Sequence, residues 1–129
     1  MRILFVDNHP AFTATVVATF LSNHEVVIVP TVAGARRALD GTGEALVTPF
    51  DAVLVDYDLD DGKGDDLVRW IRSSADGTTT LMRCIPIVAV SARDEGNTAL
   101  VAAGADAACG KLAFATIESV LATMTVKVE

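Results

Sequence analysis

The sequence has few of the residues that mark several common classes of protein. Of its 129 residues only two are cysteines, Cys84 and Cys109, and their separation matches neither a zinc-ligand nor a redox motif. With no secretory segment in view, we expect both to be reduced thiols and the protein to be cytoplasmic. Aromatic residues make up only 5% of the chain, so the packing must depend mainly on Val, Ala, Leu and Ile.

Basic residues and long apolar runs are also scarce. Ten Lys and Arg residues stand against 17 Asp and Glu residues, which gives a net charge of -7 and an isoelectric point of about 4.6. Phosphate backbones would be repelled by this charge, so we expect no direct nucleic-acid partner. No apolar stretch approaches the roughly 18 residues of a membrane span, and Asp7 ends the first apolar run well short of a signal-peptide core. We therefore expect no membrane partner.

The abundant residues are apolar. They make up 51% of the chain and give a mean hydropathy of +0.43, as expected where central strands are buried on both faces. The length predicts a single domain over residues 1–129.

Short β-branched runs alternate with segments of helical spacing. The five expected strands are RILFV, EVVIV, AVLV, IPIVAV and DAAC, at residues 2–6, 25–29, 52–55, 85–90 and 106–109. Five helices are expected. Three are marked by apolar residues on one helical face: Phe12, Val16 and Phe20; Leu67, Trp70 and Ile71; and Phe114, Ile117, Leu121 and Met124. The other two are expected at residues 32–39 and 93–103.

Residues that favour helix ends support this division. Pro10 suits the first turn of a helix, Ser91 is a candidate cap, and Gly104 suits a left-handed helix end. The alternation predicts an α/β, doubly wound, five-stranded parallel sheet in the order 2-1-3-4-5, with helices on both faces. Ligands of such sheets lie at the carboxyl ends of the strands.

Polar residues follow four of the expected strands at that edge. Asp7 and Asn8 follow the first strand, Asp56 the third, Ser91 the fourth and Lys111 the fifth. In the predicted order the first and third strands are neighbours, so the first three of these side chains should converge. Each also has a simpler interpretation as a helix start, a cap or a surface residue, with Asp56 the least easily explained in that way.

The chain resembles the receiver domains of two-component response regulators, which have a flavodoxin-like fold. The resemblance covers nearly the whole length and is carried by ILFVDNHP, DAVLVDYDLDDGKG, PIVAVSA and GADAACGKLAF. It implies a phosphoacceptor domain that signals by protein docking, and not an enzyme beyond its own phosphorylation and dephosphorylation.

The resemblance also implies a role for each site residue. Asp56 would accept a phosphoryl group from a sensor histidine kinase or a phosphotransfer protein. Mg²⁺ would be held by Asp7, Asp56 and the backbone carbonyl of Asp58, with Asn8 beside them. Phosphate oxygens would be contacted by Ser91 and Lys111.

Three positions depart from the family pattern. Asn8 replaces a second acid, Leu112 replaces a proline that follows a cis peptide, and Ala108 replaces an aromatic side chain that moves on activation. We expect weaker cation binding, a trans and shifted loop after Lys111, and no aromatic switch. These departures leave open a pseudo-receiver that binds proteins without phosphorylation. In either case, the face made by the fourth helix, fifth strand and fifth helix would bind a downstream protein or a second copy.

Two other interpretations are disfavoured. A calcium loop counted from Asp56 needs Gly at position 6 and Glu at position 12, where the chain has Asp61 and Leu67. DYDLD also resembles haloacid-dehalogenase-type phosphatases, but those enzymes carry the motif on their first strand and need a longer chain. His9 and His24 are expected to be turn or surface residues and not ligands.

Overall fold

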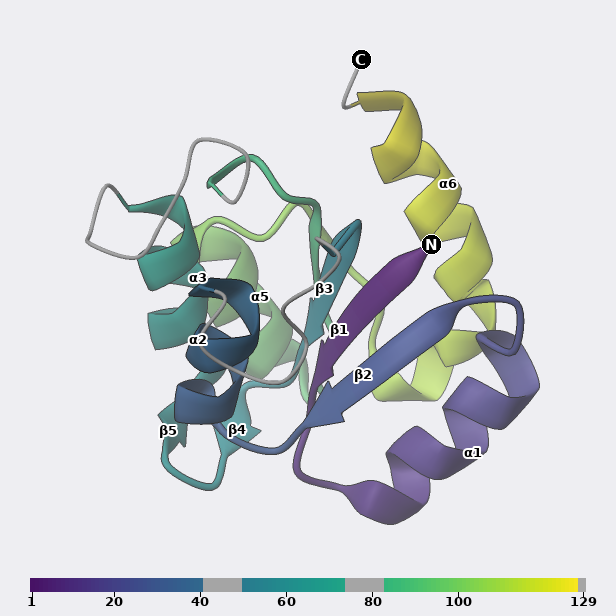
Figure 1. Ribbon diagram of the computed structural model, residues 1–129, viewed down its shortest axis with the longest axis horizontal. Coiled ribbons are helices and arrows are strands. Elements are labelled where there is room, and N and C mark those ends of the chain that lie inside the picture. The colour runs from purple at the N-terminus through teal and green to yellow at the C-terminus, as the bar shows by residue number, and fades with distance from the viewer. Residues whose placement is uncertain (41–49, 74–82, 128–129) are drawn as a thin grey trace.

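The computed structural model of the protein describes residues 1–40, 50–73 and 83–127. A central sheet lies between two layers of helices (Figure 1). Its strands are β1 (Arg2–Val6), β2 (Glu25–Val29), β3 (Ala52–Val55), β6 (Ile87–Ala89) and β7 (Ala107–Ala108). They lie in the order β2-β1-β3-β6-β7 and all pair in parallel. In chain order this is 2-1-3-4-5, so the predicted fold class and strand order are confirmed.

A small hairpin that the sequence does not predict follows β3. It pairs β4 (Asp58–Leu59) with β5 (Gly62–Lys63) in an antiparallel sheet of two strands. The hairpin lies beside the lower end of the main sheet in Figure 1.

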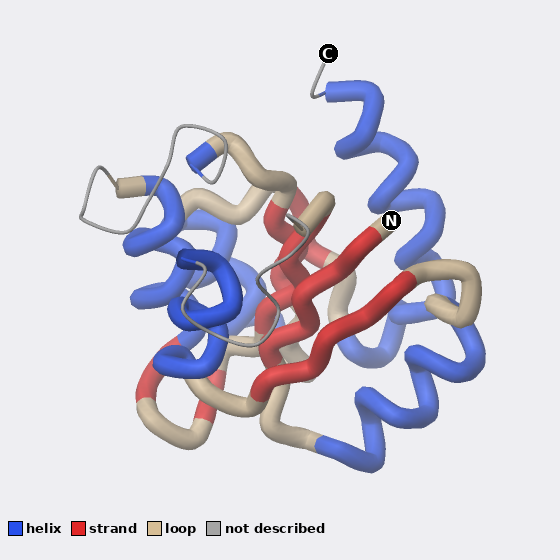
Figure 2. Tube along the Cα trace, viewed as in Figure 1, coloured by secondary structure: helices blue, strands red, loops and turns tan. Residues whose placement is uncertain are grey.

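The helices divide between the two faces of the sheet (Figures 1 and 2). One face is covered by α1 (Pro10–Phe20) and α6 (Ile117–Lys127), and the other by α2 (Val32–Asp40), α3 (Gly64–Arg72) and α5 (Asp94–Ala103). None of the helices in the described residues is both long and apolar enough to span a membrane.

The strands supply both halves of the core because successive side chains point to opposite faces. Leu4 and Val6 pack in the cluster under α2, α3 and α5, whereas Ile3 and Phe5 pack in the cluster under α1 and α6. All four side chains are fully buried. Burial on both faces explains the unbroken apolar runs in the sequence.

Four of the few aromatic residues form one cluster on the α1 and α6 side. Phe114 lies at its centre, with its ring centroid 5.9 Å from Phe5, 5.7 Å from Phe12 and 6.1 Å from Phe20. Aromatic pairs at such separations stabilise a core beyond the area they bury. The cluster therefore joins the chain after β7 to α1 and β1.

The expected helix ends are partly correct. Pro10 does begin α1, and Gly104 ends α5 with a φ of +128°. The expectation that Ser91 caps α5 is wrong, because that helix begins at Asp94 with Arg93 as its N-cap residue.

The last helix also differs from expectation. Phe114 lies in a separate 3-10 segment, η1 (Lys111–Thr116), which is interrupted by non-helical dihedrals at Ala113 before α6 begins. The long connection that we expect to be mobile or to contact a partner, residues 73–84, falls mostly at residues 74–82, outside the described residues.

Candidate functional site

Two buried carboxylates lie at the carboxyl ends of neighbouring strands. Asp7 follows β1 and is 2% exposed, and Asp56 follows β3 and is 4% exposed. The backbone N–H of Asp7 donates to Val29 O at 3.0 Å, and that of Asp56 donates to Val6 O at 2.9 Å. These bonds continue the strand pairing by one residue and so fix both side chains at the same edge of the sheet.

The ammonium group of Lys111 lies between the two carboxylates. Its Nζ is 3.1 Å from Asp7 Oδ2 and 3.1 Å from Asp56 Oδ2, and 4.7 Å from the ring centroid of Phe12. The contact with Asp56 is a hydrogen bond, but the contact with Asp7 is an ion pair without hydrogen-bond geometry, so Asp7 Oδ2 is buried without a hydrogen bond. The site therefore holds two negative charges and one tethered positive charge.

This environment alters the proton affinity of Asp56. Burial, followed by the negative charge of Asp7, raises the pKa of Asp56, while Lys111 and the backbone N–H of Tyr57 act in the opposite direction. That N–H donates to Asp56 Oδ1 at 2.8 Å. The net rise in pKa means that the ionised carboxylate is under-compensated, so a further cation would stabilise it.

Ser91 is held rigidly at the end of β6. Its backbone N–H donates to Asn97 Oδ1 at 2.9 Å, and its carbonyl accepts from Asn97 Nδ2 at 3.2 Å. The same carbonyl accepts the backbone N–H of Lys111 at 3.1 Å. The Ser91 hydroxyl oxygen accepts the Arg93 N–H at 3.2 Å. Ser91 and Lys111 are thus joined by one backbone hydrogen bond.

A pocket of about 400 Å³ opens above these groups. Its lining residues are His9, Phe12, Asp56, Asp58, Ser91, Ala92, Arg93 and Lys111. Three of the expected functional side chains, those of Asp56, Ser91 and Lys111, therefore face one space.

Asn8 and Asp58 are engaged elsewhere. The Asn8 amide donates to Asp60 Oδ1 at 3.0 Å, while its own Oδ1 is buried without a hydrogen bond. The Asp58 carboxylate is hydrogen-bonded to Lys63 and lies 3.3 Å from Arg93. Lys63 is the main cause of the lowered pKa of Asp58. The Asp58 side chain thus has its own cations, and its carbonyl as a cation ligand stays a prediction.

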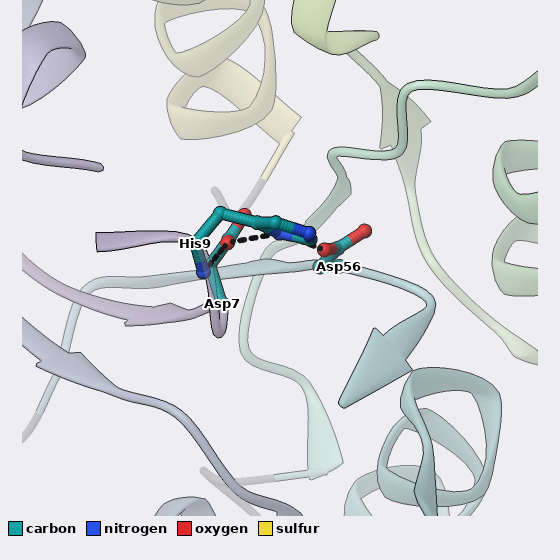
Figure 3. Close-up of side chains that lie close together, drawn as sticks. All are labelled: Asp7, His9 and Asp56. Atoms are coloured by element: carbon teal, nitrogen blue, oxygen red, sulfur yellow. Dashed lines mark hydrogen bonds and ion pairs between the residues drawn. The ribbon is translucent and has the colours of Figure 1, made fainter. Parts of the chain in front are cut away.

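His9 is a member of the site that the sequence does not predict. Its Nδ1 is 3.0 Å from Asp7 Oδ1 and 3.3 Å from Asp56 Oδ2 (Figure 3). It is the N-cap residue of α1 and its side chain is 55% exposed, so the expected turn and surface position is correct. The available signal was its place between Asp7 and Pro10, where the chain turns back across the end of β1.

The donor set fits a divalent cation. One ligand atom from each of Asp7, His9 and Asp56 lies within 4.8 Å of the others, and the buried Asp7 Oδ2 lacks a hydrogen bond. Carboxylate oxygens and imidazole nitrogen are ordinary ligands of divalent metals.

The two departures around Lys111 are visible in the structure. No peptide bond in the described residues is cis, so the expected trans bond after Lys111 is confirmed. The side chain of Leu112 is almost fully exposed, and Ala108 lies exposed on β7.

Comparisons with known proteins find similar solved structures but no matching sequence family. No protein-family model matches the chain, and no curated protein sequence matches it. Among solved structures, a receiver domain of a sensor histidine kinase from Pseudomonas aeruginosa, described with a magnesium ion in its active-site cleft, matches with a TM-score of 0.75 and 25% identity over 95% of each chain.

Two further structures match in the same way. The signal receiver domain of a histidine kinase from Syntrophus aciditrophicus has a TM-score of 0.78 and 18% identity, covering 99% of this chain and 92% of its own. A phosphorylated cyanobacterial phytochrome response regulator has a TM-score of 0.74 and 20% identity, covering 95% of this chain and 94% of its own. Together with the strand order, these matches show that the chain has the receiver-domain fold of two-component response regulators.

Proposed function

We propose that residues 1–129 form a phosphoacceptor receiver domain in which Asp56 is phosphorylated with the help of Mg²⁺. The observation that carries this proposal is the meeting of Asp7, Asp56 and Lys111, which come from three separate strand ends. Lys111 Nζ lies 3.1 Å from a carboxylate oxygen of each aspartate. The magnesium-bound and phosphorylated neighbours support the same chemistry by likeness of fold.

The transfer follows from the groups present. A carboxylate oxygen of Asp56 forms a bond to phosphorus while the bond from phosphorus to the donor histidine nitrogen breaks. Mg²⁺, when bound by Asp7, Asp56, the Asp58 carbonyl and Asn8, supplies charge neutralisation. Lys111 and the Ser91 hydroxyl then donate hydrogen bonds to phosphoryl oxygens, because both already face the pocket.

The partners follow from this chemistry. A sensor histidine kinase or phosphotransfer protein in the cytoplasm would supply the phosphoryl group, and no other substrate would be turned over. A downstream protein, or a second copy of the chain, would dock on α5, β7 and α6. Ala108 on that face has no side-chain rotamers, so the signal must pass by another route than an aromatic movement.

The second candidate is a pseudo-receiver that binds proteins without phosphorylation. It is favoured by Asn8, which carries no charge and whose amide is occupied by Asp60. A site with one carboxylate fewer binds Mg²⁺ more weakly, and the proposed transfer to Asp56 depends on that ion.

Beryllium fluoride with Mg²⁺, a mimic of the acyl phosphate, distinguishes the two candidates. At a ligand concentration 100 times the Kd, binding stabilises the folded state by about 2.7 kcal/mol, so thermal denaturation of the wild type should shift upward. Asp56→Asn should abolish the shift. Asp66→Asn, which removes an exposed acid of α3, should retain it. An unchanged melting temperature of the wild type at saturating ligand would favour the pseudo-receiver.

A further inference from the structure

One nitrogen of the His9 imidazole faces the cation site. Its Nδ1 lies 2.9 Å from Lys111 Nζ and 3.0 Å from Asp7 Oδ1. The ammonium can only donate and the carboxylate can only accept, so this nitrogen stands between a donor and an acceptor. In the tautomer with the ring proton on Nε2, the Nδ1 lone pair is free to bind a metal.

Three acceptor atoms surround the Lys111 ammonium. They are His9 Nδ1 at 2.9 Å, Asp7 Oδ2 at 3.1 Å and Asp56 Oδ2 at 3.1 Å. The ammonium thus marks a position for a positive charge that is enclosed by one nitrogen and two oxygen atoms. Asp7 Oδ2 is buried and makes no hydrogen bond there, so its lone pairs stay free for a better-placed cation.

The position of the ring is set by the chain itself. The backbone N–H of His9 donates to Asp7 Oδ1 at 2.8 Å, and Pro10 begins α1 immediately afterwards. The imidazole is held near both carboxylates, while its 55% exposure leaves access for water and for an incoming ion.

The ligand set has therefore lost a carboxylate at Asn8 and gained an imidazole at His9. Mg²⁺ prefers oxygen ligands and gives up its water reluctantly, whereas imidazole favours Co²⁺ and Zn²⁺. We infer that His9 Nδ1 is a further protein ligand of the cation site, so that the site prefers a transition-type divalent ion to Mg²⁺. This inference deepens the proposed function, since it names the residue that sets the metal preference of the same site.

Titration with Co²⁺ and with Mg²⁺ tests the inference by direct binding. His9→Phe keeps a ring of similar size without the nitrogen, and His9→Ala removes the ring. Each should lower Co²⁺ affinity by about tenfold or more and change Mg²⁺ affinity by less than about threefold. The visible absorption of bound Co²⁺ should also change, because a nitrogen ligand is lost.

His24→Phe is the matched control. His24 lies beside the N-terminus and Glu118, away from the pocket lining, so its replacement should leave Co²⁺ affinity and absorption unchanged. Equal Co²⁺ affinity and absorption in the wild type and both His9 variants would overturn the inference, as would a wild type that binds Mg²⁺ more tightly than Co²⁺.

The inference and the proposed function can fail separately. Co²⁺ binding that depends on His9 in a protein that takes up no phosphoryl group would sustain the inference and refute phosphorylation. Phosphorylation of Asp56 with Mg²⁺, together with a Co²⁺ affinity that is unchanged when His9 is replaced, would sustain the proposed function and refute the inference.

Discussion

At the scale of single residues, the behaviour of Asp56 depends on the balance between burial and charge. Burial and the neighbouring Asp7 disfavour its ionised form more than Lys111 and the Tyr57 N–H favour it. A carboxyl group whose pKa is raised in the folded state contributes stability below its unfolded pKa of about 3.9. That contribution is lost as pH rises through the folded pKa.

Asp56→Asn should therefore stabilise the metal-free protein at neutral pH. The amide keeps the shape of the carboxylate but removes a buried charge, and we expect a gain on the order of 1 kcal/mol in unfolding free energy at pH 7. The gain should shrink as pH falls through the raised pKa of the folded state, because the wild-type carboxyl then loses its buried charge by taking up a proton. Urea denaturation between pH 4 and pH 8 measures it, with Asp66→Asn as the control.

Addition of Mg²⁺ should reduce the difference in unfolding free energy between Asp56→Asn and the wild type, because the cation stabilises the wild-type carboxylate. An Asp56→Asn variant that is less stable than the wild type at pH 7, or a difference that does not vary with pH, would contradict this description of the site.

Single residues also show which parts of the site could be predicted. Asp7, Asp56 and Lys111 each come directly after, or within three residues of, a strand, so an alternating sequence pattern places them at one edge. His9 could not be placed in this way, because its contacts depend on the turn between β1 and α1. The pairing of Asp58 with Lys63 depends on the β4–β5 hairpin, which the sequence does not predict.

At the scale of elements, the start of α3 lies against the backbone that follows β3. The N–H of Gly64 donates to Tyr57 O at 2.6 Å. A Cβ atom at Gly64 would lie 1.9 Å from the carbonyl oxygen of Asp56, whereas one at Gly62 would meet only Val32 Cγ2, at 3.7 Å. The absence of a side chain at Gly64 therefore lets α3 fix the backbone of Asp56.

Gly64→Ala should destabilise the fold and displace Asp56. Because the clash is with backbone and not with a flexible side chain, we expect a loss of about 2 kcal/mol or more together with weaker binding of beryllium fluoride. Gly62→Ala, in the adjoining β4–β5 hairpin, should change stability by no more than about 0.5 kcal/mol. Chemical denaturation and titration of both variants measure these effects, and equal behaviour of the two would show that the close approach at Gly64 has no structural role.

The strands of the main sheet and most of the helices could be predicted, whereas the β4–β5 hairpin could not. The β1 and β2 runs are almost continuously apolar, and the buried residues of α3 recur at helical spacing. In β4 and β5, with two residues each, no period can develop. The chain after Lys111 has a regular apolar spacing, yet it forms η1 before α6. Phe114, within η1, packs in the aromatic cluster with Phe5, Phe12 and Phe20.

At the scale of the whole molecule, the order of the strands brings the site together. Asp7, Asp56 and Lys111 are separated by 49 and 55 positions in the sequence. The parallel order β2-β1-β3-β6-β7 brings the ends of β1, β3 and β7 to one edge of the sheet, with only β6 between β3 and β7. The fold was predictable because its strands and helices alternate regularly. The place of His9 in the site was not, because it depends on how one exposed imidazole turns toward two buried acids.

The most direct measurement is the intact mass of the protein after incubation with a small phosphodonor and Mg²⁺. We expect the wild type to gain the mass of one phosphoryl group, and Asp56→Asn to gain none while Asp66→Asn behaves as the wild type. A wild type that gains no mass, or an Asp56→Asn variant that still does, would contradict the assignment of Asp56 as the phosphoacceptor.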